Sequence, residues 1–131
     1  MRRVLVLLTA LALVWSGGCS APEDESAWLR DARPLLERAG AVKAEMSRGD
    51  FDPAVSRSLI LETRAALAAF EPVDEHGAEF EQLIRDAMDY YGEGLKAYEA
   101  RLPEVSRQWI GQANETIAEA RRLVERYEQE R

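Results

Sequence analysis

Few side chains in this sequence have the types and spacing that catalysis or metal binding requires. The 131 residues include one cysteine, Cys19, and one histidine, His76. Glu79 follows His76 by one helical turn, but a zinc site takes three or four ligands, usually Cys and His. No glycine-rich phosphate loop and no Gly-x-Ser-x-Gly motif occurs. The sequence therefore predicts no metal site, no cofactor and no enzymatic activity, and we interpret His76 as a surface residue.

The segment before the cysteine has the order of regions found in a secretory signal peptide. Met1-Arg2-Arg3 is basic, and the run from Val4 to Val14 is apolar apart from Thr9. The small residues Ser16-Gly17-Gly18 then precede the expected cleavage site. The apolar run is too short for a membrane-spanning helix, which needs about 20 residues. We therefore interpret residues 1–18 as a signal that is removed.

The small residues directly before a lone cysteine, Ser16-Gly17-Gly18-Cys19, resemble the lipobox of bacterial lipoproteins. The family pattern usually has Leu where this sequence has Ser16. The resemblance implies cleavage before Cys19 and a diacylglycerol on its sulfur, which would hold the protein at a membrane of the cell envelope. Buried acyl chains contribute about 0.8 kcal/mol per CH2, so two or three of them anchor a protein permanently. In family terms, Ser20 favours the outer membrane, on its periplasmic side, if the cell has two membranes.

Ordinary secretion is the alternative, because Cys19-Ser20-Ala21 also offers small residues to a conventional signal peptidase. That cut would release a chain without cysteine. In the lipoprotein interpretation, residues 19–25 form a short acidic tether. The six residues after the cysteine, Ser20 to Glu25, reach about 20 Å at full extension, so the following domain is expected to lie close to its bilayer.

Residues 26–131 show the three- and four-residue spacing of apolar positions that predicts amphipathic helices. The first helix begins at Ser26 with a kink at Pro34, or at Asp31 with Pro34 in its first turn. Gly49 is expected to end it. Its apolar stripe consists of Trp28, Ala32, Leu35, Ala39, Val42 and Met46.

Three further helices are expected after this one. Asp52-Pro53 and Asp74 supply N-caps for the second and third, and Pro103 permits a fourth. Their apolar stripes are Val55, Leu59, Ile60, Thr63, Ala66, Leu67 and Phe70; Phe80, Ile84, Ala87, Tyr91, Gly94, Tyr98 and Leu102; and Ile110, Ala113, Ile117, Ala120, Val124 and Tyr127. The sequence thus predicts an all-α, up-and-down bundle of four helices. The alternative has three helices, the last of them long and kinked at Pro103.

Acidic and aromatic residues of the third expected helix are the candidates for contact with a partner. The formal net charge of -7 disfavours nucleic acid and anionic lipid headgroups as partners. Tyr90 and Gly92 lie off the apolar stripe without a packing reason, and they are the predicted partner contact. An acidic stripe, interpreted either as a solvated face or as a dock for a basic partner, lies opposite the apolar one and consists of Glu75, Glu79, Gln82, Asp86, Asp89 and Glu93.

These features predict a membrane-anchored cell-envelope lipoprotein with a small acidic helical domain. Its role is expected to be non-enzymatic, either binding another protein or supporting an envelope assembly. The alternative function is a ligand-binding bundle that holds a small apolar or cationic molecule among Tyr91, Tyr98 and Trp109.

Overall fold

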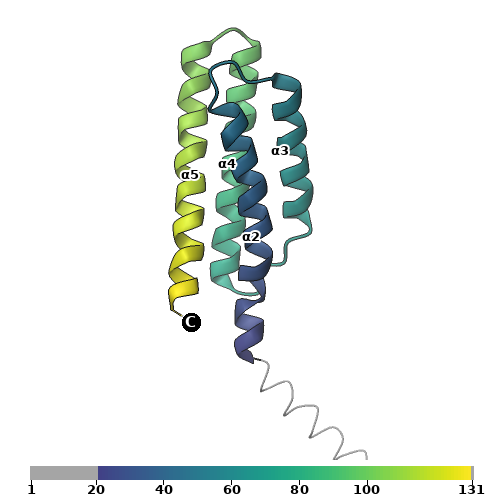
Figure 1. Ribbon diagram of the computed structural model, residues 1–131, viewed down its shortest axis with the longest axis vertical. Coiled ribbons are helices and arrows are strands. Elements are labelled where there is room, and N and C mark those ends of the chain that lie inside the picture. The colour runs from purple at the N-terminus through teal and green to yellow at the C-terminus, as the bar shows by residue number, and fades with distance from the viewer. Residues whose placement is uncertain (1–20, 131) are drawn as a thin grey trace, which may run out of the picture.

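Four α-helices in an up-and-down bundle make up the part of the chain that the structure describes (Figure 1). The computed structural model describes residues 21–130, with side chains from Ala27 onward. The helices are α2 (Ala21–Met46), α3 (Pro53–Ala68), α4 (Glu75–Glu99) and α5 (Pro103–Gln129). Residues 21–130 contain no strand. The predicted all-α bundle of four helices is therefore confirmed.

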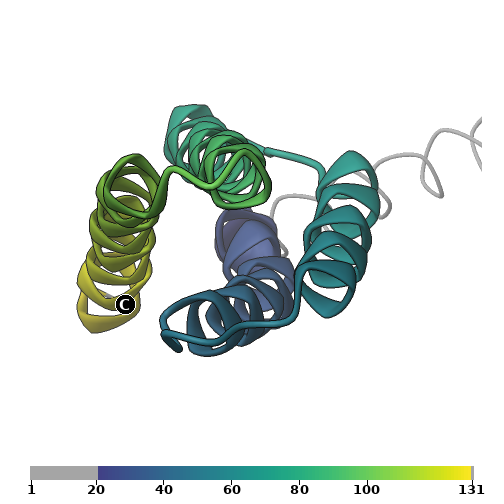
Figure 2. The same ribbon diagram turned by 90° about the horizontal axis from the view of Figure 1, so that it is seen from above.

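The bundle has a flattened cross-section. Helix α2 contacts each of the other three helices, whereas α3 and α5 share no contact within the described residues. Viewed along the bundle, α2 and α4 lie across the short diagonal, and α3 and α5 occupy the far corners (Figure 2). Helix α3 therefore packs against α2 and α4 alone.

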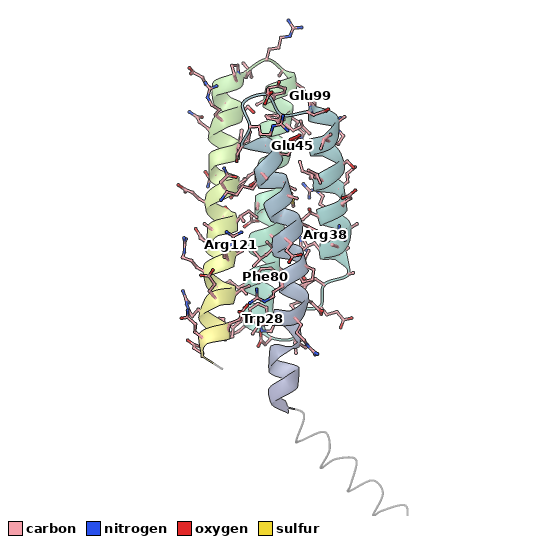
Figure 3. The ribbon with its side chains drawn as sticks, in the orientation of Figure 1. Trp28, Arg38, Glu45, Phe80, Glu99 and Arg121 are labelled. Carbon is pink, nitrogen blue, oxygen red and sulfur yellow. The ribbon has the colours of Figure 1, made fainter. Side chains whose placement is uncertain are left out.

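One hydrophobic core runs the length of the bundle. All six residues of the apolar stripe predicted for the first helix are buried in α2, from Trp28 to Met46. Near the end of the bundle where α2 begins, the rings of Trp28 and Phe80 lie with their centroids 6.0 Å apart (Figure 3). Gly94 allows α4 to approach α5 closely, because a Cβ there would lie only 3.0 Å from Ile110. These contacts bury the apolar face of each helix against its neighbours.

Helix α2 differs from its prediction at both ends. It begins at Ala21, so residues 21–25 of the acidic tether belong to the helix. Pro34 lies inside the helix on its exposed side, and the carbonyl of Arg30, which loses its helical donor there, belongs to an exposed residue that water can reach. The helix ends at Met46, and Gly49 lies in the following loop without a positive φ. The predicted starts and the predicted stop at Gly49 are therefore wrong.

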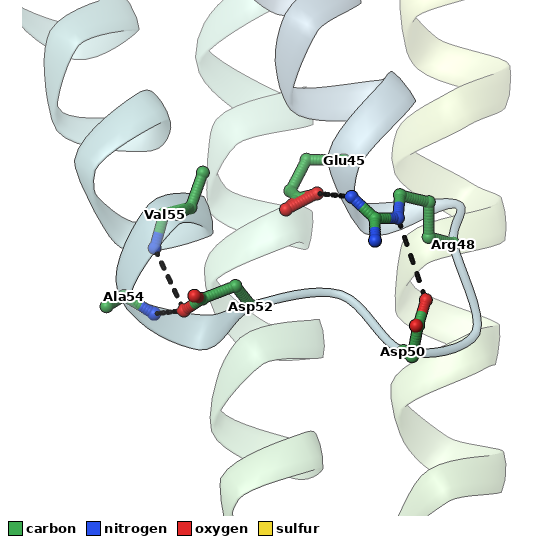
Figure 4. A network of polar contacts seen from close by, with 6 residues as sticks. All are labelled: Glu45, Arg48, Asp50, Asp52, Ala54 and Val55. Carbon is green, nitrogen blue, oxygen red and sulfur yellow. Dashed lines mark hydrogen bonds and ion pairs between the residues drawn. The ribbon is translucent and has the colours of Figure 1, made fainter.

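The two predicted aspartate caps are both present. The Asp52 carboxylate accepts hydrogen bonds from the backbone N–H groups of Ala54 and Val55, at 2.8 and 3.3 Å (Figure 4). The Asp74 carboxylate accepts one from Gly77 N–H at 2.8 Å. Each cap satisfies donors that a helix leaves without intrahelical partners, so each fixes the start of its helix.

Surface ion pairs connect the loop between α2 and α3 to the last turn of α2. The Arg48 guanidinium lies 3.2 Å from the Glu45 carboxylate and 3.6 Å from the Asp50 carboxylate (Figure 4). Arg48 and Asp50 are mostly exposed, so these contacts contribute little to stability.

The chain reverses between α4 and α5 without a glycine. Arg101 adopts a positive φ of 63°, in the left-handed region. Its N–H donates to the carbonyl of Tyr98 at 3.0 Å, and the N–H of Leu102 donates to the carbonyl of Ala97 at 2.8 Å. This pair of bonds is the Schellman arrangement that closes a helix C-terminus. The alternative of three helices, with a long one kinked at Pro103, is therefore wrong.

Two residues of the predicted apolar stripes are exposed. Val55 is 44% exposed, and its neighbour Ser56 is buried in its place. Leu102 is 51% exposed because α4 ends at Glu99, so the helical spacing no longer applies to it.

Candidate functional site

Cys19, the predicted lipid-bearing residue, lies outside the described residues. The first turn of α2 begins two residues after it, at Ala21, and α2 extends beyond the ends of the neighbouring helices there (Figure 1). Within residues 21–130, no helix is long and apolar enough to cross a bilayer. The end of the bundle from which α2 extends is called the α2 end below.

Tyr90 and Gly92, the predicted partner contact, lie on different sides of α4. The Tyr90 ring stacks on Trp109 of α5, with centroids 5.8 Å apart. Gly92 faces α3, because a Cβ there would lie 3.8 Å from the Arg64 guanidinium. Two residues at this spacing are about 200° apart around a helix, so they do not form one patch. A partner contact at either residue stays a prediction.

The acidic stripe of α4 is a largely solvent-exposed face. All of its members are exposed except Asp86, which is half-buried. Asp86 accepts a hydrogen bond from Gln82 at 2.8 Å, and Asp89 pairs with Arg64 of α3 at 3.0 Å. Tyr90 is adjacent to this stripe on the side of α5. The face therefore presents carboxylates beside a half-buried aromatic pair, Tyr90 and Trp109.

The three aromatic residues proposed to enclose a ligand do not converge. Tyr91 is fully buried, whereas Tyr98 is half-buried against Phe51 with ring centroids 4.3 Å apart. Trp109 stacks on Tyr90 at the outer surface. Each ring thus has a different neighbourhood, and none of the three lines either of the grooves described below.

Tyr91 begins a polar chain that runs from the core to the surface. Its hydroxyl donates to Asn114 Oδ1 at 2.6 Å, and Asn114 Nδ2 donates to Ser47 Oγ at 3.2 Å. Burial raises the pKa of Tyr91 above its ordinary value of 10.0, because the phenolate loses hydration in the core. The chain joins α4, α5 and the end of α2, and it satisfies a buried hydroxyl, so we assign it a structural role.

His76 is half-buried and paired, contrary to its prediction as a plain surface residue. Its ring lies against Tyr127 of α5 with centroids 4.2 Å apart, and the Tyr127 hydroxyl is 2.7 Å from His76 Nδ1. Desolvation, with the nearby Glu130 carboxylate as a secondary cause, raises the pKa of Tyr127. The rings of Tyr127 and Trp28 also pack edge to face, with their centroids 6.0 Å apart. This aromatic group closes the α2 end of the core.

Two surface grooves flank α2, and neither was predictable from the spacing of residues in the sequence. One, of about 310 Å³, lies between α2 and α5 and has Leu36 and Val124 among its lining residues. The other, of about 330 Å³, lies between α2 and α3 and includes Leu59 and Thr63. Charged side chains surround both, including Glu37, which lines the two grooves. The first is called the α2–α5 groove below.

Neither a metal site nor a comparison with known proteins assigns a function to this chain. The described residues contain no group of three or more His, Cys, Asp or Glu side chains placed to hold a metal ion. Comparison with family models, with curated proteins and with solved structures found no match to this chain.

Proposed function

We propose that this protein is a cell-envelope lipoprotein, anchored through lipid on Cys19, whose helical domain binds another protein without enzymatic activity. The observation that carries the proposal is the lone cysteine that directly follows a basic, apolar and small-residue leader. The position of α2 supports it, since the described part of the chain starts with α2 only two positions after Cys19 in the sequence, so a lipid there would lie at the α2 end.

The anchor is tested by replacing its sulfur. We expect Cys19→Ser to abolish incorporation of a radiolabelled or clickable fatty acid and to leave unprocessed precursor in the cell. Ser20→Ala is the matched control, because it changes a neighbouring hydroxyl and keeps the thiol. Fatty-acid labelling that survives in Cys19→Ser, or a mature wild-type chain recovered in solution that begins beyond Cys19, would contradict the proposal.

The outer face of α4 is the surface that best suits a protein partner. It combines exposed carboxylates with the Tyr90 and Trp109 rings, and aromatic residues with polar tips are enriched at protein interfaces. A basic partner segment would complement the charge of this face.

Site-specific crosslinking in intact cells tests this surface. A photoreactive residue at Glu93, which is exposed one turn from Tyr90, is expected to capture one discrete partner. The same residue at Leu61, 60% exposed on α3, is the control and is expected to capture no other protein. Identical capture from both positions, or capture from neither, would contradict a partner-binding face on α4.

A small-ligand-binding function is a second candidate, and a different observation favours it. The α2–α5 groove has a volume of about 310 Å³, at the lower end of the range for small-molecule sites, and Leu36 and Val124 are apolar members of its mostly charged lining.

A further inference from the structure

Helix α3 has an uncharged outer face, called the α3 face below. Its residues follow one another by four, three, four and three positions, so they lie on one side of the helix. They lie opposite the buried residues of α3, and each of them is exposed to solvent. The α3 face consists of Ala54, Ser58, Leu61, Ala65 and Ala68.

An uncharged outer face sets α3 apart from the other helices. The exposed sides of α2, α4 and α5 carry charged residues such as Glu37, Glu93 and Arg122, whereas only three of the 16 residues of α3 are charged. Helix α3 occupies a corner of the bundle, where no other helix of the described residues covers this face (Figure 2). Leu61, at its centre, is 60% exposed. A helix face that is apolar and faces outward indicates contact with another molecule.

Charged residues of opposite sign border the α3 face on its two sides. Arg57 and Arg64 lie on the side of α4, where they pair with Glu99 and Asp89. Their side chains remain 50% and 40% exposed, so a further carboxylate can reach them. Glu62 lies on the side of α2, where it lines the groove between α2 and α3. The α3 face is thus an uncharged strip between a basic border and an acidic one.

These borders complement a second copy of the same face in one orientation. In a parallel pair, related by a two-fold axis along the helices, the basic border of each copy meets the acidic border of the other. In an antiparallel pair, Glu62 meets its own counterpart and the arginines meet arginines. Opposite charges across an interface favour association, and like charges oppose it. The small side chains of the α3 face let the two helices approach closely.

The proposed anchor favours the same orientation. Lipid on Cys19 would place the α2 end of every copy at the bilayer, so neighbouring copies in one membrane would stand parallel. We propose that the α3 face packs side by side against the α3 face of a second copy of this chain, in a parallel pair. The orientation of the pair rests on the proposed lipid anchor as well as on the charged borders.

The pair is expected to be weak away from the membrane. One face of a 16-residue helix is smaller than the interface of about 800 Å² per partner that stable complexes form. Two copies anchored in one bilayer have a higher effective concentration for each other than two copies in solution. Intact cells are therefore the place to test the pair.

Single cysteine substitutions test it, with copper phenanthroline as the oxidant that forms disulfides. A parallel pair brings each residue of the α3 face next to its own counterpart, so Ala54→Cys, Leu61→Cys and Ala68→Cys should each give a disulfide-linked dimer. An antiparallel pair gives a dimer from Leu61→Cys alone, because Ala54 and Ala68 lie about 21 Å apart along the helix and a disulfide needs Cα atoms within about 7 Å. Ala44→Cys, exposed on α2, is the matched control, and the unsubstituted chain with Cys19 alone is the blank.

A charge placed in the α3 face tests the packing itself. Ala65→Glu, added to Leu61→Cys, is expected to reduce the yield of dimer at least threefold, because it places two like charges near the two-fold axis. Ala44→Glu, added to Leu61→Cys, makes the same change of residue on α2 and is expected to leave the yield unchanged. Circular dichroism of each purified variant shows that it remains helical.

Four outcomes would overturn the parallel pair. They are a dimer from Leu61→Cys alone, no dimer from any of the three positions, a disulfide to a different protein, and a yield that Ala65→Glu leaves undiminished in a folded variant. Failure of the anchor is a separate result. If the wild type takes up no fatty-acid label while all three positions give dimers, the lipoprotein proposal is contradicted and the parallel pair is supported.

Discussion

At the scale of single residues, the buried hydroxyl of Tyr91 stabilises the fold and makes that stability depend on pH. We expect Tyr91→Phe to destabilise the fold by about 1 kcal/mol at pH 7, because Asn114 loses its hydrogen-bond donor while the ring stays packed. Chemical denaturation at pH 7 measures the difference. Tyr90→Phe, at a half-buried position on the same helix, is the matched control and is expected to cost less.

The pH dependence of the same variant has a definite sign. The pKa of Tyr91 is raised in the folded protein, so above pH 10.0 the unfolded chain loses the phenolic proton while the folded one retains it. The contribution of the Tyr91 hydroxyl to stability is therefore fully present below pH 10.0, and it decreases as the pH rises above that value. Tyr91→Phe lacks this loss, so the stability gap between wild type and variant should narrow with rising pH. A gap that is constant to pH 11 would contradict the assignment.

His76 shows what residue type alone does not reveal. Its place two residues after the Asp74 cap suggested a solvent-exposed ring, because the prediction considered α4 by itself. The partner that half-buries it, Tyr127, is 51 residues away on α5. Whether such a side chain is buried depends on contacts between helices. The spacing of residues along a single helix contains no information on those contacts.

At the scale of the helices, the reversal at Arg101 is a place where the sequence is not optimal for its fold. A residue other than glycine in the left-handed region carries about 1–2 kcal/mol of steric strain. Arg101→Gly removes the strain but adds chain entropy to the unfolded state, so we expect a net gain of about 0.5–1 kcal/mol. Thermal or chemical denaturation measures it.

Ala100→Gly is the matched control for this turn. Ala100 has φ -81° and needs no glycine, so the substitution should reduce stability. If both glycine variants change stability in the same direction, the strain at Arg101 is not the cause.

The boundaries of the helices divide into those that the sequence determines and those that it does not. Asp52 and Asp74 were predictable as caps, because capping depends on a side chain and a backbone that are neighbours in the chain. The start of α2 was not, because Pro34 suggested a later beginning and an exposed proline is tolerated inside this helix. Val55 was placed in the core for its residue type, whereas the positions of Ile60, Thr63 and Leu67 orient α3 so that Ser56 faces inward.

At the scale of the whole molecule, the flattened cross-section predicts unequal local stability. Helix α3 has 16 residues and, within residues 21–130, packs against α2 and α4 alone, whereas α4 packs against all three other helices. We expect native-state hydrogen exchange to show that amides of α3, such as that of Ile60, open at lower free energy than amides of α4, such as that of Ile84. Equal opening free energies throughout the bundle would contradict this.

The fold was largely predictable from the sequence, and the candidate site was not. Spacing of apolar residues defines how many helices there are and which face each buries. The α2–α5 groove depends instead on how far apart the two helices lie and on which charged side chains meet at its rim. Gly40 lines this groove, but its position in the sequence does not indicate a groove. The acidic face of α4 was visible in the sequence because it belongs to one helix.

The central place of α2 has a mechanical consequence. Because α2 contacts α3, α4 and α5, a pulling force applied at its first turn would load three helix interfaces in shear at once. The bundle should then resist extension from that point until those interfaces yield together, rather than unravelling helix by helix.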